Sequence, residues 1–268
     1  MKITVLVDNY ITKRNFIAEH GFSLLIETNG GKILFDTGQG YALKNNLDVL
    51  KIDPHGIDFI VLSHGHDDHT GGLKFFIEEK VFPRIIAHPD VVLPKYKVES
   101  GKKENIGLKY SLGIFHPEFF KGPRALDEKI VFSGEVPKVN QWELEETKYF
   151  REVNEQLEKD PFTDDVSLFV PTNKGLVVLT GCAHSGIINI IQYGLEITHS
   201  DHLRGIIGGM HLKNASQKRI EKTVSILKEL NPEFITVSHC TGLEAGVVFK
   251  SVLKDKVIFT SVGMSFSI

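Results

Sequence analysis

Short apolar runs alternate with polar turns in the first part of this chain, and they predict β-strands. Lys2–Val7, Phe22–Thr28 and Lys32–Phe35 are enriched in Val, Ile, Leu, Phe and Thr, the residue types that favour strands. An Asn-Gly-Gly sequence at 29–31 separates the last two runs, and these residues tolerate the positive φ angles of a tight turn. We therefore expect the second and third runs to form a β-hairpin.

Further along the chain, apolar residues at helical spacing alternate with short apolar runs. The expected helices are Tyr41–Leu50, Thr70–Lys80 with Thr70 as its cap, Ile187–Thr198, Ser216–Leu230 and Leu243–Leu253. The expected strands are Ile57–Ser63, Arg84–His88, Val166–Val170, Gly175–Thr180, Gly205–Gly209, Phe234–Ser238 and Val257–Ser261. Each half of the chain thus passes from a hairpin to alternating helices and strands. This order predicts an α/β (α+β) fold, a four-layer αββα sandwich of two mixed sheets with helices outside.

Residues from about 91 to 160 interrupt this pattern, because Gly and Pro punctuate them and their charge is high. Their apolar content is thin, which favours a surface insertion or lid over a separate domain. Within this stretch, Glu143–Lys159 has the pattern of an amphipathic or partly exposed helix. We therefore predict a single domain over residues 1–268 that carries an insertion at about 91–160.

The amino-acid composition indicates which kinds of binding partner to expect. The 268 residues are 41% hydrophobic, enough for a sizeable core, and the net charge is -3 with both signs interspersed. No basic stripe is present, so we expect neither a nucleic-acid nor a membrane partner. The two cysteines are too few for a typical secreted scaffold, and the chain opens without a signal-peptide pattern. A cytoplasmic setting is expected, and nothing in the sequence indicates an oligomeric state.

Four candidate metal ligands follow directly after the strand expected at residues 57–63. They are His64, His66, Asp68 and His69. Imidazole and carboxylate groups suit zinc, iron and manganese. His64 and His66 lie two residues apart on extended backbone, so their side chains leave on the same face and can bind one metal. Asp68 and His69 start the next helix and can reach a second. We expect one or two divalent metal ions, with zinc favoured and iron or manganese as alternatives.

Three later histidines, His184, His211 and His239, lie where an apolar strand meets a Gly-containing turn. Open α/β architectures place their sites at such strand ends. We predict that His184 and His239 are further metal ligands, and that His211 is either a ligand or a substrate contact. Cys182 has two interpretations, a thiolate ligand or a small buried side chain.

The motif His64-x-His66-x-Asp68-His69 at a strand-to-helix junction resembles the signature of the metallo-β-lactamase superfamily. Asp36, in the sequence Phe-Asp-Thr-Gly, resembles the earlier Asp of that superfamily. The resemblance implies the sandwich described above, with metals at one edge of its sheets. It also implies that His64 and His66 serve the first metal site, that Asp68 and His69 serve the second, and that Asp36 orients a ligand from behind.

One departure from the superfamily pattern leaves the number of metals open. Many members have Ser/Thr-Gly-Asp at the end of a later strand, where the Asp bridges two metals. Here residues 180–182 read Thr-Gly-Cys, and His184 follows. No clear His precedes that strand, so either His184 takes over the ligand role or Asp165 supplies an oxygen.

Three motifs resemble a particular branch of the superfamily, the proteins similar to 7,8-dihydropterin-6-methyl-4-(β-D-ribofuranosyl)aminobenzene-5′-phosphate synthase. These motifs are Gly181-Cys182-Ala183-His184-x-Gly186, Gly208-Gly209-Met210-His211-Leu212 and His239-Cys240-Thr241-Gly242. The branch implies a reaction that joins a pterin to a ribofuranosyl-aminobenzene phosphate. It also suggests a protein similar to dihydropteroate synthases.

The sequence therefore predicts a metal-dependent, hydrolase-like enzyme acting on a small-molecule substrate, with a phosphorylated substrate as one candidate. Bound metal would polarise a substrate oxygen and lower the pKa of a bound water to about 7. Asp68 and His211 are the candidate catalytic residues, and His211 is also the candidate substrate-binding residue. The alternative is a metal-holding binding protein or redox sensor without turnover, in which Cys182 or Cys240 responds.

Overall fold

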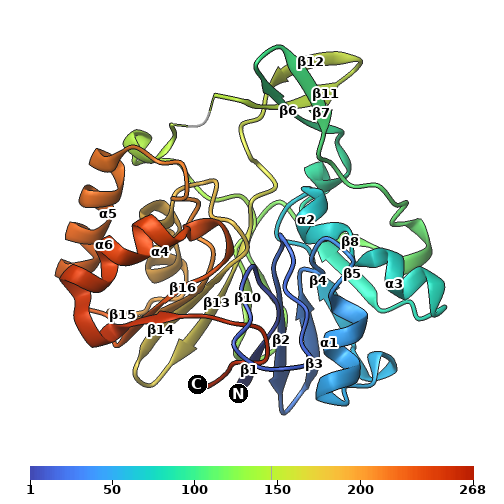
Figure 1. Ribbon diagram of the computed structural model, residues 1–268, viewed down its shortest axis with the longest axis horizontal. Helices are drawn as coiled ribbons and strands as arrows, with labels where there is room; N and C mark the ends of the chain where they lie inside the picture. The colour runs from blue at the N-terminus through green and yellow to red at the C-terminus, as the bar shows by residue number, and fades with distance from the viewer. Residues whose placement is uncertain (146) are drawn as a thin grey trace. The chain divides into compact units, whose positions relative to one another are not determined.

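The computed structural model describes residues 1–145 and 147–268 and shows two compact units. Unit 1 consists of residues 1–121, 147–164 and 261–268, and unit 2 consists of residues 122–145 and 165–260. Each unit contains one mixed seven-stranded sheet, and Figure 1 labels many of the strands and helices. The α/β class predicted from the sequence is therefore confirmed, while the single domain with an insertion at about 91–160 stays a prediction.

The sheet of unit 1 has the strand order β18-β1-β2-β3-β4-β5-β8. Its strands are β1 Lys2–Val7, β2 Ser23–Thr28, β3 Gly31–Phe35, β4 Phe59–Val61, β5 Arg84–Ala87, β8 Glu118–Phe119 and β18 Ser265–Ser267. The expected hairpin is β2–β3, in which Leu25 pairs with Leu34 and Thr28 with Gly31. Strands β3, β4, β5 and β8 run parallel, and parallel neighbours require crossover connections. The helices α1 Leu43–Leu50 and α3 Leu73–Glu78 lie in these crossovers and bury Leu47 and Phe76 in the core of unit 1.

The helix expected over Thr70–Lys80 is wrong in its boundaries. The chain forms the short helix α2 Asp67–Thr70 and then α3, and the residue that precedes α3 is Gly72, without a side-chain cap from Thr70. The break has a steric reason, because a Cβ on Gly72 would overlap the carbonyl oxygen of Thr37. Only glycine permits this close approach, which holds the segment after the histidine motif against the chain that leaves β3.

Unit 1 also contains a small four-stranded sheet of order β12-β11-β6-β7. Its strands are β6 Lys95–Glu99, β7 Lys102–Asn105, β11 Tyr149–Val153 and β12 Gln156–Lys159. The helix expected over Glu143–Lys159 is therefore wrong. Aromatic and β-branched residues favour strands in β11, and Asn154 and Glu155 adopt φ angles of 50° and 65°, as the two central residues of a tight hairpin turn do.

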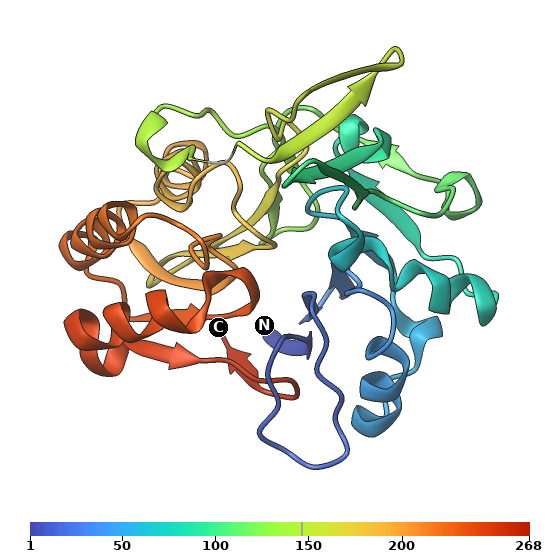
Figure 2. The same cartoon turned by 45° about the horizontal axis from the view of Figure 1, so that its top comes forward.

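The sheet of unit 2 has the order β17-β16-β15-β14-β13-β10-β9. Its strands are β9 Arg124–Ala125, β10 Val131–Phe132, β13 Ser167–Thr172, β14 Gly175–Thr180, β15 Leu203–Gly208, β16 Phe234–Val237 and β17 Val257–Phe259. Strands β14 to β17 are parallel, and α4 Ile187–Ile197, α5 Gln217–Leu230 and α6 Leu243–Leu253 connect them. Both views show these helices together beside the sheet (Figure 1 and Figure 2). The carboxyl ends of β14, β15 and β16 thus lie side by side.

Helix α5 follows the predicted pattern closely. The Ser216 hydroxyl accepts a hydrogen bond from the Arg219 amide at 3.2 Å and so caps the helix. Ile220, Val224 and Leu227 are buried on one face, as their spacing predicts. Short 3₁₀ helices complete the described chain: η1 Pro54–Gly56, η2 Pro89–Val92, η3 Gly113–Phe115, η4 Gln141–Glu143, η5 His239–Thr241 and η6 Lys254–Lys256. No helix in residues 1–145 or 147–268 has the length and apolar character needed to cross a bilayer.

Candidate metal centre

The structure brings the predicted site residues together in two groups, one in each unit. The group in unit 1 is the histidine loop, residues 63–69, which leaves β4 and enters α2. The His64 ring centroid lies 4.5 Å from that of His66 and 4.3 Å from that of His69. All three side chains are buried. A strand followed by a tight loop therefore collects three imidazole rings within a few ångströms of one another, as the alternation of His64 and His66 predicts.

The buried carboxylate of Asp36 organises this loop. One of its oxygens accepts the Ser63 amide at 2.7 Å, and the other accepts the Ser63 hydroxyl at 2.7 Å and lies 2.7 Å from His69 Nδ1. A carboxylate only accepts hydrogen bonds, so His69 must carry its proton on Nδ1. The lone pair of the neutral ring is then on Nε2, the state in which a histidine binds metal.

Ser63 connects Asp36 to His64 and so fixes the tautomer of that ring as well. The Ser63 Oγ lies 2.9 Å from His64 Nδ1. Because the single hydroxyl proton of Ser63 is donated to Asp36, Oγ accepts from His64 Nδ1, which must also be protonated. Asp36 therefore fixes the tautomer of both His64 and His69, and the lone pair of each ring lies on Nε2. The role implied for Asp36 by the family resemblance agrees with these contacts.

Burial keeps two of the imidazoles neutral. It lowers the pKa of His64 well below its usual range, with the neighbouring His69 and His66 adding to the effect. Burial likewise lowers the pKa of His66 to about 3. A metal ion needs the neutral ring, so both side chains are in the ligand form at neutral pH. The chemistry of the donor set fits a divalent metal.

Asp68 and His69 form the second pair of predicted ligands. Its Oδ2 is 3.8 Å from His69 Nε2 and 3.2 Å from Nε2 of His20. His20 is not among the predicted site residues, and it belongs to the long loop between β1 and β2 that Figure 2 shows in blue. No local motif marks His20, because only the fold carries this loop to the start of α2. Asp67, in contrast, bonds to Lys109 Nζ at 2.6 Å.

A buried ion cluster supports the histidine loop from the small sheet. Lys95 Nζ, on β6, lies 2.8 Å from both Asp160 and Asp164, and the Lys95 side chain is 1% exposed. The other oxygen of Asp164 accepts the amide of Gly65 at 2.9 Å. Burial lowers the pKa of Lys95, but the carboxylates of Asp164 and Asp160 outweigh it and hold that pKa above its usual range. The protonated Lys95 thus fixes the carboxylate that holds the backbone between His64 and His66.

The group in unit 2 comes from three adjacent strand ends. Cys182 and His184 follow β14, His211 follows β15, and η5 contains His239 and Cys240 after β16. The rings of His184 and His211 have centroids 4.0 Å apart. His211 and His239 have φ angles of 49° and 43°, an uncommon conformation for residues other than glycine, and one that clusters at functional sites. These strand ends place Cys182 in one group with His184 and His211 and in another with His239 and Cys240.

Asp165 has a structural contact in the same unit. Its Oδ2 accepts the Ser185 amide at 2.7 Å, so it holds the loop that carries His184. Whether any of these residues binds metal stays a prediction, and the same holds for Asp165 as an oxygen ligand.

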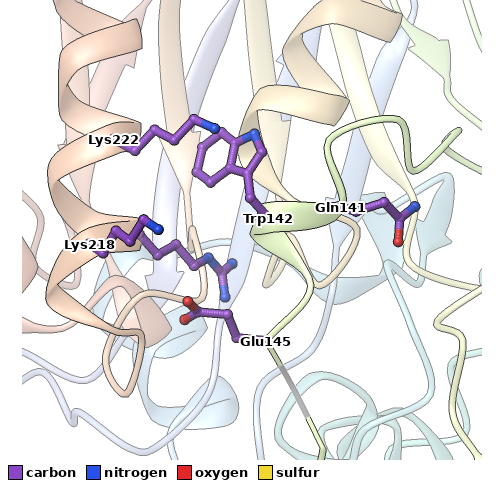
Figure 3. Close-up of a pocket in the computed structure, with 6 residues that line it drawn as sticks. Gln141, Trp142, Glu145, Lys218 and Lys222 are labelled. Atoms are coloured by element: carbon purple, nitrogen blue, oxygen red, sulfur yellow. The ribbon is translucent and has the colours of Figure 1, made fainter.

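A cavity of about 280 Å³ lies elsewhere in unit 2, between η4 and α5. Figure 3 shows Trp142 with the Lys222 side chain over its ring, and Lys222 Nζ is 4.2 Å from the ring centroid. Glu145 lines the same cavity, and its carboxylate accepts the amide and hydroxyl of Ser216 at the start of α5. No predicted ligand lines this cavity, and Lys222 already lies over an aromatic ring.

Comparison with known proteins defines the class. Residues 17–194 match the sequence profile of the Metallo-beta-lactamase superfamily, and the chain belongs to that superfamily. A crystal structure of Tm1679, a metal-dependent hydrolase of the β-lactamase superfamily, has a TM-score of 0.88 and 30% identity, covering 100% of this chain and 99% of that one. The predicted fold type is therefore confirmed.

Two relatives from Methanocaldococcus jannaschii indicate which branch of the superfamily this chain resembles. One is a 7,8-dihydropterin-6-methyl-4-(β-D-ribofuranosyl)-aminobenzene-5′-phosphate synthase, 33% identical over 282 residues and covering 95% of this chain and 92% of its own. The other is the uncharacterized protein MJ0448, 39% identical over 247 residues, with 91% of each chain covered. The similarity to the synthase branch is confirmed. The expected likeness to dihydropteroate synthases is wrong, because the matching relative is a different pterin-related synthase.

Replacing Asp36 with Asn should weaken zinc binding by roughly 10- to 100-fold, the usual effect of losing a carboxylate behind a ligating histidine. The amide keeps the volume of the side chain but no longer requires a proton on Nδ1 of His69. Zinc affinity of the metal-stripped protein is measured by competition with a chromophoric chelator. Asp53→Asn is the matched control, since Asp53 also contacts a histidine ring, at 3.0 Å from His55 Nδ1, but is exposed. Unchanged zinc affinity in folded Asp36→Asn would contradict the role given to this carboxylate.

Replacing Lys95 with Met should lower the free energy of unfolding by about 3–5 kcal/mol, because two buried carboxylates lose their counter-charge. Urea unfolding at neutral pH measures the loss. Lys97→Met on the same strand should cost less than about 1 kcal/mol, since Lys97 is partly exposed and pairs with an exposed Glu99. Adding Asp160→Asn and Asp164→Asn to Lys95→Met should restore part of the stability. Equal effects of the two Lys→Met changes would rule out the buried cluster as a stabilising element.

Proposed function

We propose that this protein is a metal-dependent enzyme that acts on a small-molecule substrate through one or two divalent metal ions. The proposed ligands are the residues predicted from the sequence: His64, His66, Asp68, His69, His184 and His239. The observation that carries the proposal is the Asp36–Ser63 network, which sets the Nδ1–H tautomer of His64 and His69. Burying a polar network of this kind costs free energy, because its groups lose their hydrogen bonds to water. Orienting metal ligands is the most direct function for such a network.

Zinc is the proposed metal, because imidazole and carboxylate donors suit it, with iron and manganese as alternatives. When bound, such an ion polarises a substrate oxygen and lowers the pKa of a coordinated water. The chain itself supplies the remaining functions. Asp68 and His211 are the proposed groups for moving a proton, and His211 is also the proposed contact to the substrate.

The proposed substrate is a small phosphorylated molecule related to the pterin branch. The name of the synthase relative, at 33% identity, supports a pterin or a ribofuranosyl-aminobenzene phosphate. The description of Tm1679 as a metal-dependent hydrolase supports hydrolytic chemistry at the same kind of site. Transfer and hydrolysis both require a polarised substrate oxygen, so one donor set suits either reaction.

A second candidate is a metal-holding binding protein or redox sensor without turnover. Cys182 and Cys240 support it, because both are buried and belong to the same group of unit 2. This candidate predicts that thiol-blocking reagents change the behaviour of the protein while no substrate is turned over.

Replacing His66 with Ala should remove metal and activity together. Losing a ligand should reduce metal affinity by more than the roughly 10- to 100-fold that follows when a residue hydrogen-bonded to a ligand is changed. Metal content is measured by mass spectrometry of the purified protein. Activity is measured on a phosphodiester, a lactone, and a dihydropterin supplied with ribofuranosyl-aminobenzene phosphate.

His55→Ala is the control for this experiment, since His55 is an exposed histidine outside the loop. It should keep full metal content and full turnover. Turnover by a His66→Ala protein with no metal bound would refute the enzyme proposal. Metal binding without turnover of any substrate class, combined with sensitivity to thiol blocking, would instead favour the sensor.

A further inference from the structure

We infer that the cavity between η4 and α5 is a binding site for a small organic phosphate. The cavity has a volume of about 280 Å³, and all of its lining residues belong to unit 2: Gln141, Trp142, Glu145, Lys218, Arg219 and Lys222. Small-molecule sites begin at roughly this volume, so the ligand is a compact phosphate monoester and not a dinucleotide. None of the proposed metal ligands lines the cavity, so binding there does not depend on the proposed function.

The cavity carries an excess of positive charge. Three basic residues and one acidic residue line it, namely Lys218, Arg219, Lys222 and Glu145. Lys218 and Lys222 are four residues apart, so they lie one turn apart on the same face of α5. Figure 3 shows both on the side of the helix that faces Trp142. Among the described residues, no carboxylate forms an ion pair with either ammonium group. An anion in the cavity would supply that counter-charge.

The indole of Trp142 positions one of the two ammonium groups. Lys222 Nζ lies 4.2 Å from the centroid of the ring, and the π face of an indole attracts a cation. The ring has no net charge, so this contact orients the ammonium group without neutralising it. The ring and the methylene stems of the two lysines also give the cavity an apolar wall. The ammonium groups suit a phosphate, and the wall suits an apolar group attached to it.

Hydrogen bonds hold the indole in place before any ligand binds. Trp142 Nε1 donates to Asn140 Oδ1 at 3.3 Å, and the Asn140 backbone amide donates to Asn189 Oδ1 at 2.7 Å. The buried carboxylate of Glu143 accepts the amides of Ile188 and Asn189 at 3.1 and 2.9 Å. These contacts attach η4 to the start of α4. A wall that is already ordered loses little conformational freedom on binding, which favours affinity.

The two other charged groups of the cavity are engaged within the protein. Glu145 accepts the amide of Ser216 at 3.0 Å and its hydroxyl at 2.5 Å. Its negative charge therefore lies at the N-terminus of α5, where the helix dipole offsets part of it. Arg219 is buried. Burial raises the pKa of Glu143, and hydrogen bonds from backbone amides and the positive charge of Arg219 oppose that rise. The two lysines are thus the groups that bind the phosphate.

Trp142 is the single tryptophan of the chain, so tryptophan fluorescence reports on this cavity. Phenyl phosphate is titrated into metal-stripped protein at low ionic strength, which excludes binding through a metal ion. We expect a saturable change in emission and matching heat in calorimetry, with a Kd of about 1 mM or tighter. Phenol and inorganic phosphate should each bind more weakly than phenyl phosphate. Added salt should weaken the binding of phenyl phosphate, because it screens exposed charges.

Lys218→Gln and Lys222→Gln should each weaken the binding of phenyl phosphate by roughly 2- to 5-fold, the range for an exposed charge pair. The double substitution should weaken it by roughly 10-fold, if the two effects combine. Lys228→Gln is the matched control, since Lys228 is also exposed on α5 but does not line the cavity. This variant should bind phenyl phosphate as tightly as the wild-type protein does.

The absence of both a saturable fluorescence change and binding heat would overturn the inference. Equal affinities of the double variant and the Lys228→Gln control would overturn it as well. Phenol that binds as tightly as phenyl phosphate would exclude an anion site, and inorganic phosphate that does so would exclude the organic part of the ligand. Metal uptake by the wild-type protein is measured separately, and its failure would overturn the proposed function alone.

Discussion

The carboxylate of Asp36 is the contact on which the histidine loop depends. It is fully buried, and a buried ionised carboxylate is stable only when hydrogen bonds replace its water. Ser63 supplies two of those bonds and His69 supplies the third. The pairing of β3 with β4, in which Phe35 lies opposite Val61, brings Asp36 and Ser63 to the same strand ends. The register of the sheet thus determines which nitrogen of each imidazole is available as a ligand.

The small four-stranded sheet supports the same loop from a different direction. Lys95 reaches from β6 to two carboxylates that follow β12, and one of them accepts the Gly65 amide. The amide of Asp67 donates to the carbonyl of Ile106 at 2.8 Å. Changes in this sheet therefore act on the histidine loop through its backbone. A segment that is distant in sequence becomes part of the support for the candidate ligands.

Local patterns were sufficient to predict much of the fold and part of the site. Strands with β-branched residues, the β2–β3 hairpin and α5 with its Ser216 cap depend on interactions between near neighbours in the chain. The histidine loop follows from the same kind of pattern, because His64 and His66 alternate along one extended segment. His184, His211 and His239 were predicted from their places after apolar strands, since the ends of adjacent parallel strands meet at one edge.

The features that the sequence analysis missed depend on contacts between distant segments. Nothing near Lys95 in the sequence indicates that it is buried, since its partners lie about 65 residues later. His20 has no motif and reaches Asp68 only because a long loop returns to α2. The break after Thr70 is set by the Thr37 carbonyl, which packs against Gly72. The β11–β12 hairpin gives no alternating pattern, because every residue of β11 is half-buried and every residue of β12 is exposed.

Asp36 sets the protonated nitrogen of His64 and His69, two of the proposed ligands, and these tautomers can be observed directly. A long-range ¹H–¹⁵N correlation spectrum of the ¹⁵N-labelled, zinc-loaded protein distinguishes protonated, metal-bound and free ring nitrogens. We expect His64 and His69 to be protonated at Nδ1 and bound to zinc through Nε2. Protonation of either ring at Nε2, with zinc on Nδ1 or on neither nitrogen, would contradict it.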